Sequence, residues 1–285
     1  MPYLKSLALV LRAVDYGDTS QIVTFYTREL GKVAAIAKGA KRPSSRFVGV
    51  LEPLVLVELV CVRRRDSTAL HTVTEVDPRD AFRGARASLS RLYAATYAIE
   101  LLREMTPDEE PQPGLFDAAL SALRRIASAE EDPALAVLLF EVRALELTGH
   151  RPEVERCAGC GGGAAGGAGG AGHGGGAPPL RAFSPRAGGA LCEACAAADR
   201  AARPVSPGAL KAFAALLRAA EAERAPRLKL APSLGRELRE LLNRHIAATL
   251  ERELRLARFL SSPAERAGDV GQTPQSGAGA RSRIE

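Results

Sequence analysis

Two short cysteine motifs, Cys157-Ala-Gly-Cys160 and Cys192-Glu-Ala-Cys195, decide how this sequence is organised. Each motif is a tight turn whose two thiolates can point at one ion. Four thiolates are the ligand set of a tetrahedral structural zinc site. We therefore predict one structural zinc ion bound by Cys157, Cys160, Cys192 and Cys195. Four sulfur ligands leave no open position for water, so this ion should stabilise the fold and take no part in catalysis.

Two disulfides or a redox-active pair are the alternative use of these cysteines. The only apolar run near the N-terminus, residues 7–11, is too short for a signal peptide or a membrane span, so we expect a soluble cytoplasmic protein. In a reducing cytoplasm, this cysteine spacing favours metal. His173 is a weaker ligand candidate because almost only Gly and Ala surround it. Cys61, the fifth cysteine, is expected to be a buried free thiol.

Length and composition predict a globular chain with several parts. The 285 residues are enough for two domains and a small metal module, and 46% hydrophobic residues can form buried cores. The formal net charge of +6 mildly favours a polyanionic partner. Where the positive charge lies along the chain is more informative than its sum.

The first 80 residues have the pattern of short strands separated by turn signals. Strands are predicted at 7–11, 22–27, 33–37, 54–62 and 70–76, with Pro78 closing the segment. No helix here is long enough for a crossover between parallel strands, so a small antiparallel barrel is expected. The OB-fold, which binds oligonucleotides on its strand face and loops, is the commonest such design. An SH3-like barrel remains possible on pattern alone.

Two basic clusters fall in loops of this barrel. Residues 38–46 carry four cations and no acid: Lys38, Lys41, Arg42 and Arg46. The tip of the next hairpin carries three more: Arg63, Arg64 and Arg65. Either cluster alone is most simply an ordinary solvated loop. Both together on one small barrel indicate a surface for a phosphate backbone.

The rest of the chain has helical periodicity. Helices are predicted at 88–105, 115–129, 133–148, 206–222 and 233–260. The fold class is therefore α+β multidomain, with a five-stranded OB-fold barrel, an all-α helical domain and an inserted four-cysteine zinc module. The predicted domains are 1–79 for the barrel, 80–156 with 203–262 for the helices, and 157–202 for the module, which contains a Gly/Ala-rich insertion at 161–177. Residues 263–285 are expected to be a disordered tail.

An ordered set of motifs resembles the RecO family of bacterial DNA repair and recombination mediators. The set comprises Tyr-Gly-Asp-Thr-Ser-Gln-Ile-Val-Thr at 16–24, Lys-Gly-Ala-Lys-Arg-Pro at 38–43, Phe-Glu-Val-Arg at 140–143 and Gly-His-Arg-Pro at 149–152, then Phe-Ser-Pro at 183–185 between the two cysteine pairs. The resemblance covers roughly residues 3–260. The Gly/Ala-rich insertion is longer than expected for the family, and the tail lies outside the resemblance.

The resemblance implies a DNA-binding mediator. Members of the family bind single- and double-stranded DNA, anneal complementary strands, and act with RecR to load RecA onto DNA covered by single-strand-binding protein (SSB). The seven loop cations then become candidate DNA contacts, and the four cysteines carry over as metal ligands. Association with the nucleoid during repair is expected, without a membrane or a small-molecule substrate. Arg252 or Arg255 is a candidate partner for the acidic tail of SSB, although a solvated helix face is the simpler interpretation.

Two other classes of function remain as alternatives. An enzyme is not expected, because the chain has no phosphate-binding P-loop, no zinc-water motif and no nucleophile elbow. A zinc-ribbon adaptor that binds only protein, with incidental basic loops, is the second alternative. Aromatic residues are scarce and tryptophan is absent, so any binding of DNA should depend mainly on phosphate contacts.

Overall fold

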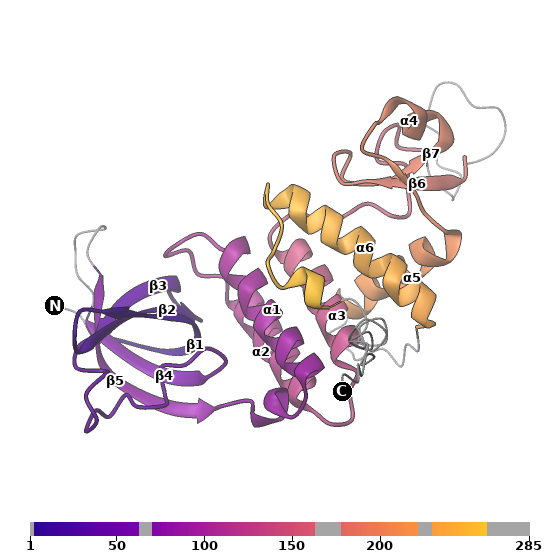
Figure 1. Ribbon diagram of the computed structural model, residues 1–285. Coiled ribbons are helices and arrows are strands. Elements are labelled where there is room, and N and C mark those ends of the chain that lie inside the picture. Colours follow the sequence, from indigo (N-terminus) through magenta and orange to yellow (C-terminus); the bar gives the residue numbers. More distant parts are fainter. Residues whose placement is uncertain (1–2, 63–69, 163–177, 222–229, 261–285) are drawn as a thin grey trace, which may run out of the picture.

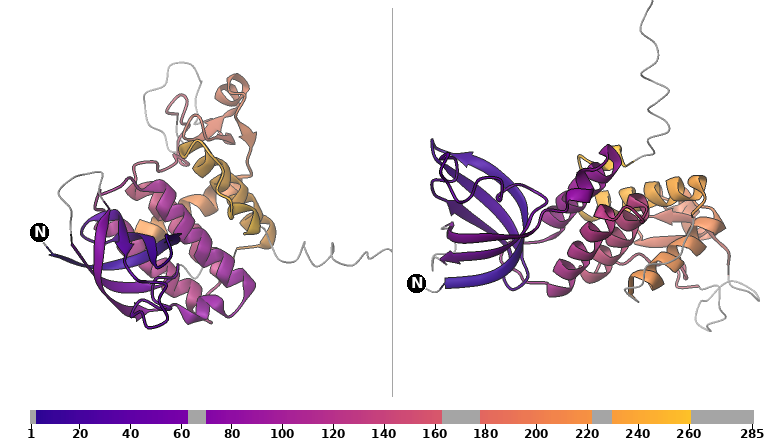
Figure 2. Two further views of the ribbon diagram at one scale, coloured as in Figure 1. Left: turned by 60° about the vertical axis from the view of Figure 1, so that its left-hand side comes forward. Right: turned by 90° about the horizontal axis from the view of Figure 1, so that it is seen from below.

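The computed structural model describes residues 3–62, 70–162, 178–221 and 230–260. A β-barrel lies at one end of the molecule, helices occupy the middle, and a small module with strands lies at the other end (Figures 1 and 2). Three predicted features fall outside the described residues: the cluster Arg63, Arg64 and Arg65, most of the insertion 161–177, and the tail 263–285.

The five N-terminal strands form a closed barrel in the order β1-β2-β3-β5-β4. Strand β1 pairs with both β2 and β4, and β3 pairs with β5 in the parallel sense. This Greek-key closure is that of the predicted OB-fold, with one parallel pair in place of a wholly antiparallel barrel. The strands are β1 (Tyr3–Tyr16), β2 (Ser20–Thr27), β3 (Gly31–Ala37), β4 (Leu56–Val62) and β5 (His71–Asp80).

Strand β1 is longer than predicted, and both of its faces are buried in the middle. Leu7, Leu9 and Leu11 alternate, yet Leu7 is 37% exposed while every residue from Ala8 to Leu11 is buried. Ala8 and Val10 face the barrel core, whereas Leu9 and Leu11 pack with the helices. The pairing with β2 shifts register just beyond Val10. A strand buried on both sides is a near-continuous apolar run, which simple alternation does not describe.

Pro78 does not close the barrel segment, as the sequence had suggested. Strand β5 continues through it to Asp80, and Pro78 lies opposite Val57, where the register between β4 and β5 shifts. Proline is tolerated at such an irregularity because its missing N–H removes no regular ladder bond.

Five helices follow near their predicted positions: α1 (Leu89–Met105), α2 (Pro113–Ala127), α3 (Pro133–Leu147), α5 (Pro207–Glu221) and α6 (Pro232–Thr249). A short 3-10 turn, η1 (Arg83–Arg86), connects the barrel to α1. Side-chain oxygens of Ser88, Asp132 and Ser206 accept backbone N–H groups at the starts of α1, α3 and α5. These caps satisfy donors that a helix start leaves unpaired.

The final helix is shorter than predicted, because α6 ends at Thr249 instead of continuing to residue 260. Glu251 has a left-handed backbone with φ of 55°, and the chain then turns back over α1. The carboxylate of Glu100 on α1 accepts the N–H groups of Arg255 and Leu256, each at 3.0 Å. A second 3-10 turn, η2 (Ala257–Phe259), follows.

The barrel is joined to the helices by specific contacts of β2 and β3. The rings of Tyr26 and Phe116 stack with centroids 6.3 Å apart. Lys32 Nζ donates to the carbonyl of Thr106 at 2.6 Å, at the end of α1, and lies 3.2 Å from the Asp108 carboxylate. Gly31 lies directly against the backbone of Glu110. These contacts fix the barrel relative to the helices.

The cysteine module is inserted between α3 and α5. It contains β6 (Leu180–Ser184), β7 (Gly189–Cys192), α4 (Glu193–Ala198) and β8 (Arg203–Pro204), with sheet order β7-β6-β8. Cys157, Leu191 and Cys192 form its small buried core. Within the described parts of the chain, no helix is long and apolar enough to cross a membrane.

Candidate functional site

The four predicted metal ligands come together in the module. One sulfur atom from each of Cys157, Cys160, Cys192 and Cys195 lies within 4.8 Å of the others. The first pair follows α3, and the second pair spans the end of β7 and the start of α4. Four cysteine sulfurs at this spacing can bind one metal ion in tetrahedral geometry.

The backbone around the cluster leaves space for the sulfur atoms and stabilises their ionised form. A Cβ on Gly159 would lie 2.9 Å from Cys195 Sγ, so only glycine leaves room for that sulfur. Cys192 N donates a hydrogen bond to Cys157 Sγ at 3.3 Å. Burial opposes ionisation of Cys157, but N–H groups of Cys192, Cys160 and Gly159 outweigh it and lower its pKa to about 6. Such donors stabilise a thiolate, which is the metal-binding form.

The closeness of the sulfurs also explains why a cation fits the cluster. Hydrogen bonds with Cys192 and Cys157 raise the pKa of Cys195 to about 12. The Cys195 thiol therefore resists ionisation, because its proton is held in hydrogen bonds to the neighbouring sulfur atoms. A divalent cation at the centre compensates the negative charge of all four sulfurs, and its binding releases protons. The donor set is that of structural zinc.

The first basic loop crosses one end of the barrel. Lys41 N donates to the carbonyl of Thr19 in the β1–β2 turn at 2.9 Å. Ala40, Phe47 and Leu51 insert into the barrel core and anchor the segment that connects β3 to β4. The loop is therefore held in place at both ends of its basic stretch, and its polar side chains face outward.

The four cations of this loop differ in their partners. Lys41 Nζ lies 2.8 Å from the Asp15 carboxylate, and its hydrogen bond lowers the pKa of Asp15. The Arg46 guanidinium donates to the carbonyl of Thr74 and lies over the Phe47 ring. Lys38 and Arg42 are exposed, and neither side chain has an ion pair or hydrogen bond with a described residue. Of the four cations, only Lys41 therefore has an acidic partner among the described residues, and Lys38 and Arg42 are the two without any side-chain partner.

Most aromatic residues of the barrel are unavailable to a ligand. Phe25 and Phe47 lie in the barrel core, and Tyr26 lies against the helices. Tyr3 and Tyr16 are 71% and 55% exposed. Tyr16 ends β1 next to Asp15, the partner of Lys41, so it is beside the basic loop. In the sequence, Tyr16 stands out only as the start of the 16–24 motif and not as a contact residue, because periodicity gives no measure of its exposure.

Two basic residues near the C-terminus occupy different environments from those expected. Neither Arg252 nor Arg255 is on α6, which ends before them. Arg252 forms an ion pair with Glu104, whereas Arg255 is exposed at a groove beside the module. Sequence reasoning missed the other arginines of this groove, because they are spread over more than seventy residues and form no motif.

Comparison with known proteins gives two family matches that together cover almost the whole of the described chain. The family model for the N-terminal part of recombination protein O matches residues 1–82. The model for its C-terminal part matches residues 86–258. The two matches meet at the connection between the barrel and the helices.

Curated relatives match over nearly their full length. A protein of Myxococcus xanthus named DNA repair protein RecO is 38% identical over 89% of this chain and 95% of its own. Proteins with the same name from Anaeromyxobacter dehalogenans and Rhodopirellula baltica are 37% and 34% identical, over 91% and 89% of this chain and 96% and 97% of their own.

Proposed function

Because this chain belongs to the RecO family, we propose that it is a DNA-binding mediator of recombinational DNA repair. In this proposal it binds single- and double-stranded DNA and anneals complementary strands. With RecR it helps to load RecA onto single-stranded DNA covered by SSB. This activity takes place in the cytoplasm at the nucleoid and needs no catalytic residue.

The observation that carries the proposal is the exposed positive charge of the barrel loop. Lys38 and Arg42 project from a segment anchored in the barrel core, so their charges are presented at a defined place. A phosphate backbone is attracted to such fixed cations, and the counterions that it releases favour binding. Lys41 and Arg46 belong to the same loop, and Arg63, Arg64 and Arg65, which lie outside the described residues, are further proposed contacts.

Annealing follows from charge neutralisation rather than from base recognition. Two strands repel each other through their phosphates, and a basic surface lowers this barrier by screening them. The Watson–Crick edges must stay free for pairing. Exposed aromatic side chains are few on the described barrel, with Tyr3 and Tyr16 the most exposed, which suits a surface that grips the backbone.

Zinc has a structural part in this proposal. One ion bound by Cys157, Cys160, Cys192 and Cys195 would hold together a module whose buried core has only a few residues. Small modules of this kind commonly depend on metal for their stability.

The test is the salt dependence of binding to a labelled single-stranded oligonucleotide. Four phosphate contacts should give a slope of log affinity against log salt of about −3, at roughly −0.7 for each contact. Replacing Arg42 with alanine should make the slope shallower by about 0.7. Lys41→Ala is the matched control and should change it less, because Asp15 already neutralises part of that charge.

The protein-only adaptor is the alternative that this experiment addresses. Folded, metal-loaded protein that binds no oligonucleotide at low salt would contradict the proposal and support the adaptor. Tight binding that is independent of salt would contradict phosphate contacts as its basis.

A further inference from the structure

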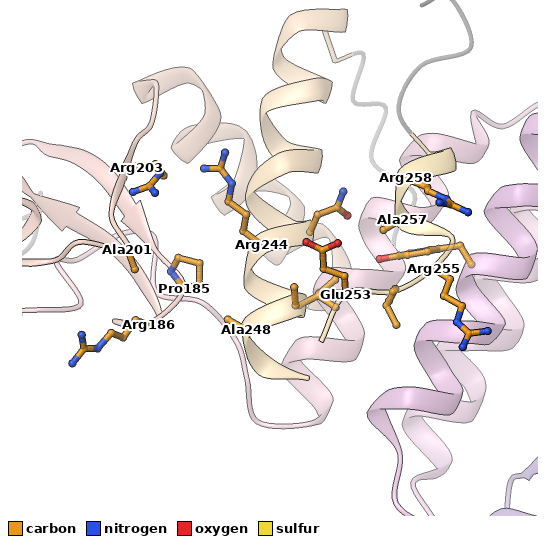
Figure 3. Close-up of a pocket in the computed structure, with 15 residues that line it drawn as sticks. Pro185, Arg186, Ala201, Arg203, Arg244, Ala248, Glu253, Arg255, Ala257 and Arg258 are labelled. Carbon is orange, nitrogen blue, oxygen red and sulfur yellow. The ribbon is translucent and has the colours of Figure 1, made fainter. Parts of the chain in front are cut away.

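A second basic surface lies far from the barrel, in a groove of about 1110 Å³ between the cysteine module and α6. Five arginines line this groove, and Glu253 is the only acid among its lining residues in the described chain. Arg186 and Arg203 come from the module, Arg244 reaches from α6 towards it, and Arg255 and Arg258 come from the segment after α6 (Figure 3). All five are exposed.

The five arginines differ in their partners: Asp199 interacts electrostatically with Arg186, two others contact uncharged groups that orient them, and two have no side-chain partner among the described residues. Arg203 Nη1 donates to the carbonyls of Arg200 and Ala202 at 2.9 and 2.8 Å, and the Arg258 guanidinium lies 4.7 Å from the centre of the Phe259 ring. Backbone carbonyls and an aromatic ring position a guanidinium without cancelling its charge. Among the described residues, the side chains of Arg244 and Arg255 have no ion pair or hydrogen bond.

The chemistry of the groove fits a chain of phosphates. A guanidinium offers several N–H donors in a planar fork that matches phosphate oxygens. The arginines are spread across the groove, with Arg186 and Arg203 at the module side and Arg255 and Arg258 at the opposite side, which suits a ligand whose charge repeats along its length (Figure 3). The apolar lining combines small residues such as Ala201, Ala248 and Ala257 with Ile246 and Leu254, which are only 2% and 7% exposed and so offer little surface to an anchoring side chain. A bound peptide usually needs a deeper apolar pocket for an anchoring side chain.

We propose that this groove binds the phosphate backbone of a second nucleic-acid strand. The barrel and the module lie at opposite ends of the molecule, with the helices between them (Figures 1 and 2). The two basic surfaces are thus separate, and one chain can hold two strands at the same time. This inference rests on the proposed function and assigns the second strand of annealing to a defined site.

The test uses charge reversal in the groove of the full-length, zinc-loaded protein. In the Arg244→Glu, Arg255→Glu double variant, the first oligonucleotide should still bind through the barrel. Capture of a second, differently labelled strand of non-complementary sequence should fall by about tenfold or more, and the rate of annealing should fall with it. Arg218→Glu is the control, because Arg218 is exposed on α5, pairs with Glu155 and does not line the groove.

The barrel variant Lys38→Glu, Arg42→Glu separates this inference from the proposed function. The barrel variant should retain weak strand binding through the groove. A protein that combines the two barrel and the two groove substitutions should bind no strand. If the wild type captures two strands but the groove variant behaves like Arg218→Glu, the groove assignment is wrong while the proposed function stands. If the groove variant instead loses only the binding of a synthetic acidic peptide, the groove is a peptide site and the proposal is overturned.

Discussion

His245 illustrates how a single residue links stability to pH. It is only 5% exposed, and its Nε2 lies 2.9 Å from the carbonyl oxygen of His150. Its ring contacts Phe183 edge-on, where α6 meets the cysteine module. Burial lowers the pKa of His245 below its ordinary value of 6.5; the hydrogen bond with the His150 carbonyl partly opposes this shift, and the charge of His150 adds to it. The folded protein therefore favours the neutral ring.

The free energy of unfolding should depend on pH, because the unfolded chain protonates His245 more readily than the folded protein does. As pH falls through about 6.5, the unfolded chain binds a proton at this position before the folded protein does. The free energy of unfolding should thus be steady above about pH 7 and decrease below it. His245→Gln, which keeps a donor for the His150 carbonyl, should weaken this decrease. His150→Gln, which removes only the smaller contribution of the His150 charge, should weaken the decrease less than His245→Gln does. Equal slopes for wild type and His245→Gln in denaturant titrations would show that His245 has no such role.

At the scale of elements, the cysteine module is a unit whose stability depends on bound metal. Its strands are short, its buried core is small, and its sulfurs come from both ends of the inserted segment. The barrel has a separate core formed by fifteen buried residues. Loss of metal should therefore unfold the module and leave the barrel intact.

Metal removal tests this independence directly. Zinc in small structural sites has an apparent binding free energy of about 10–16 kcal/mol, so Cys195→Ser should lose its one ion and the fold of the module. Cys61→Ala removes a buried cysteine of the barrel and should keep full metal content. Metal analysis and limited proteolysis would measure both effects. A Cys195→Ser protein with one tightly bound ion would contradict the four-sulfur site.

At the scale of the whole molecule, the joint between barrel and helices determines where the basic surfaces lie. The bidentate pair of Arg28 with Asp117 lies beside the stack of Tyr26 on Phe116. Gly31 permits the close approach, because a Cβ there would lie 2.2 Å from the carbonyl oxygen of Glu110. A rigid joint keeps the two proposed strand sites at a constant separation.

A pair of glycine substitutions isolates the contribution of this joint. Gly17 and Gly31 both have a left-handed backbone, with φ of 60° and 71°, but a Cβ on Gly17 meets no atom within 4 Å. Gly17→Ala should cost about 1–2 kcal/mol of stability through backbone strain alone. Gly31→Ala should cost clearly more and loosen the barrel from the helices. Thermal unfolding and small-angle scattering would compare the two. Equal losses of stability would mean that the contact with Glu110 matters little.

The sequence by itself determined the features that depend on local patterns. The paired cysteines predicted the sulfur cluster, because spacing alone places two thiols of each turn together. Helical periodicity predicted the starts of the five long helices to within about two residues, with Asp132 the expected cap of α3 and Pro133 its first residue. The five barrel strands followed from short apolar runs between turn signals.

Only the tertiary structure decided the features that join distant residues. Glu100 holds the segment after α6 by accepting an N–H from Arg255, 155 residues away, and Asp15 neutralises Lys41 in a loop that the sequence presents as uniformly basic. The two-sided burial of β1 and the arginine groove arise in the same way. Helical and strand periodicity describe each element's own faces, whereas pairing, burial and charge compensation depend on which other element packs against that face.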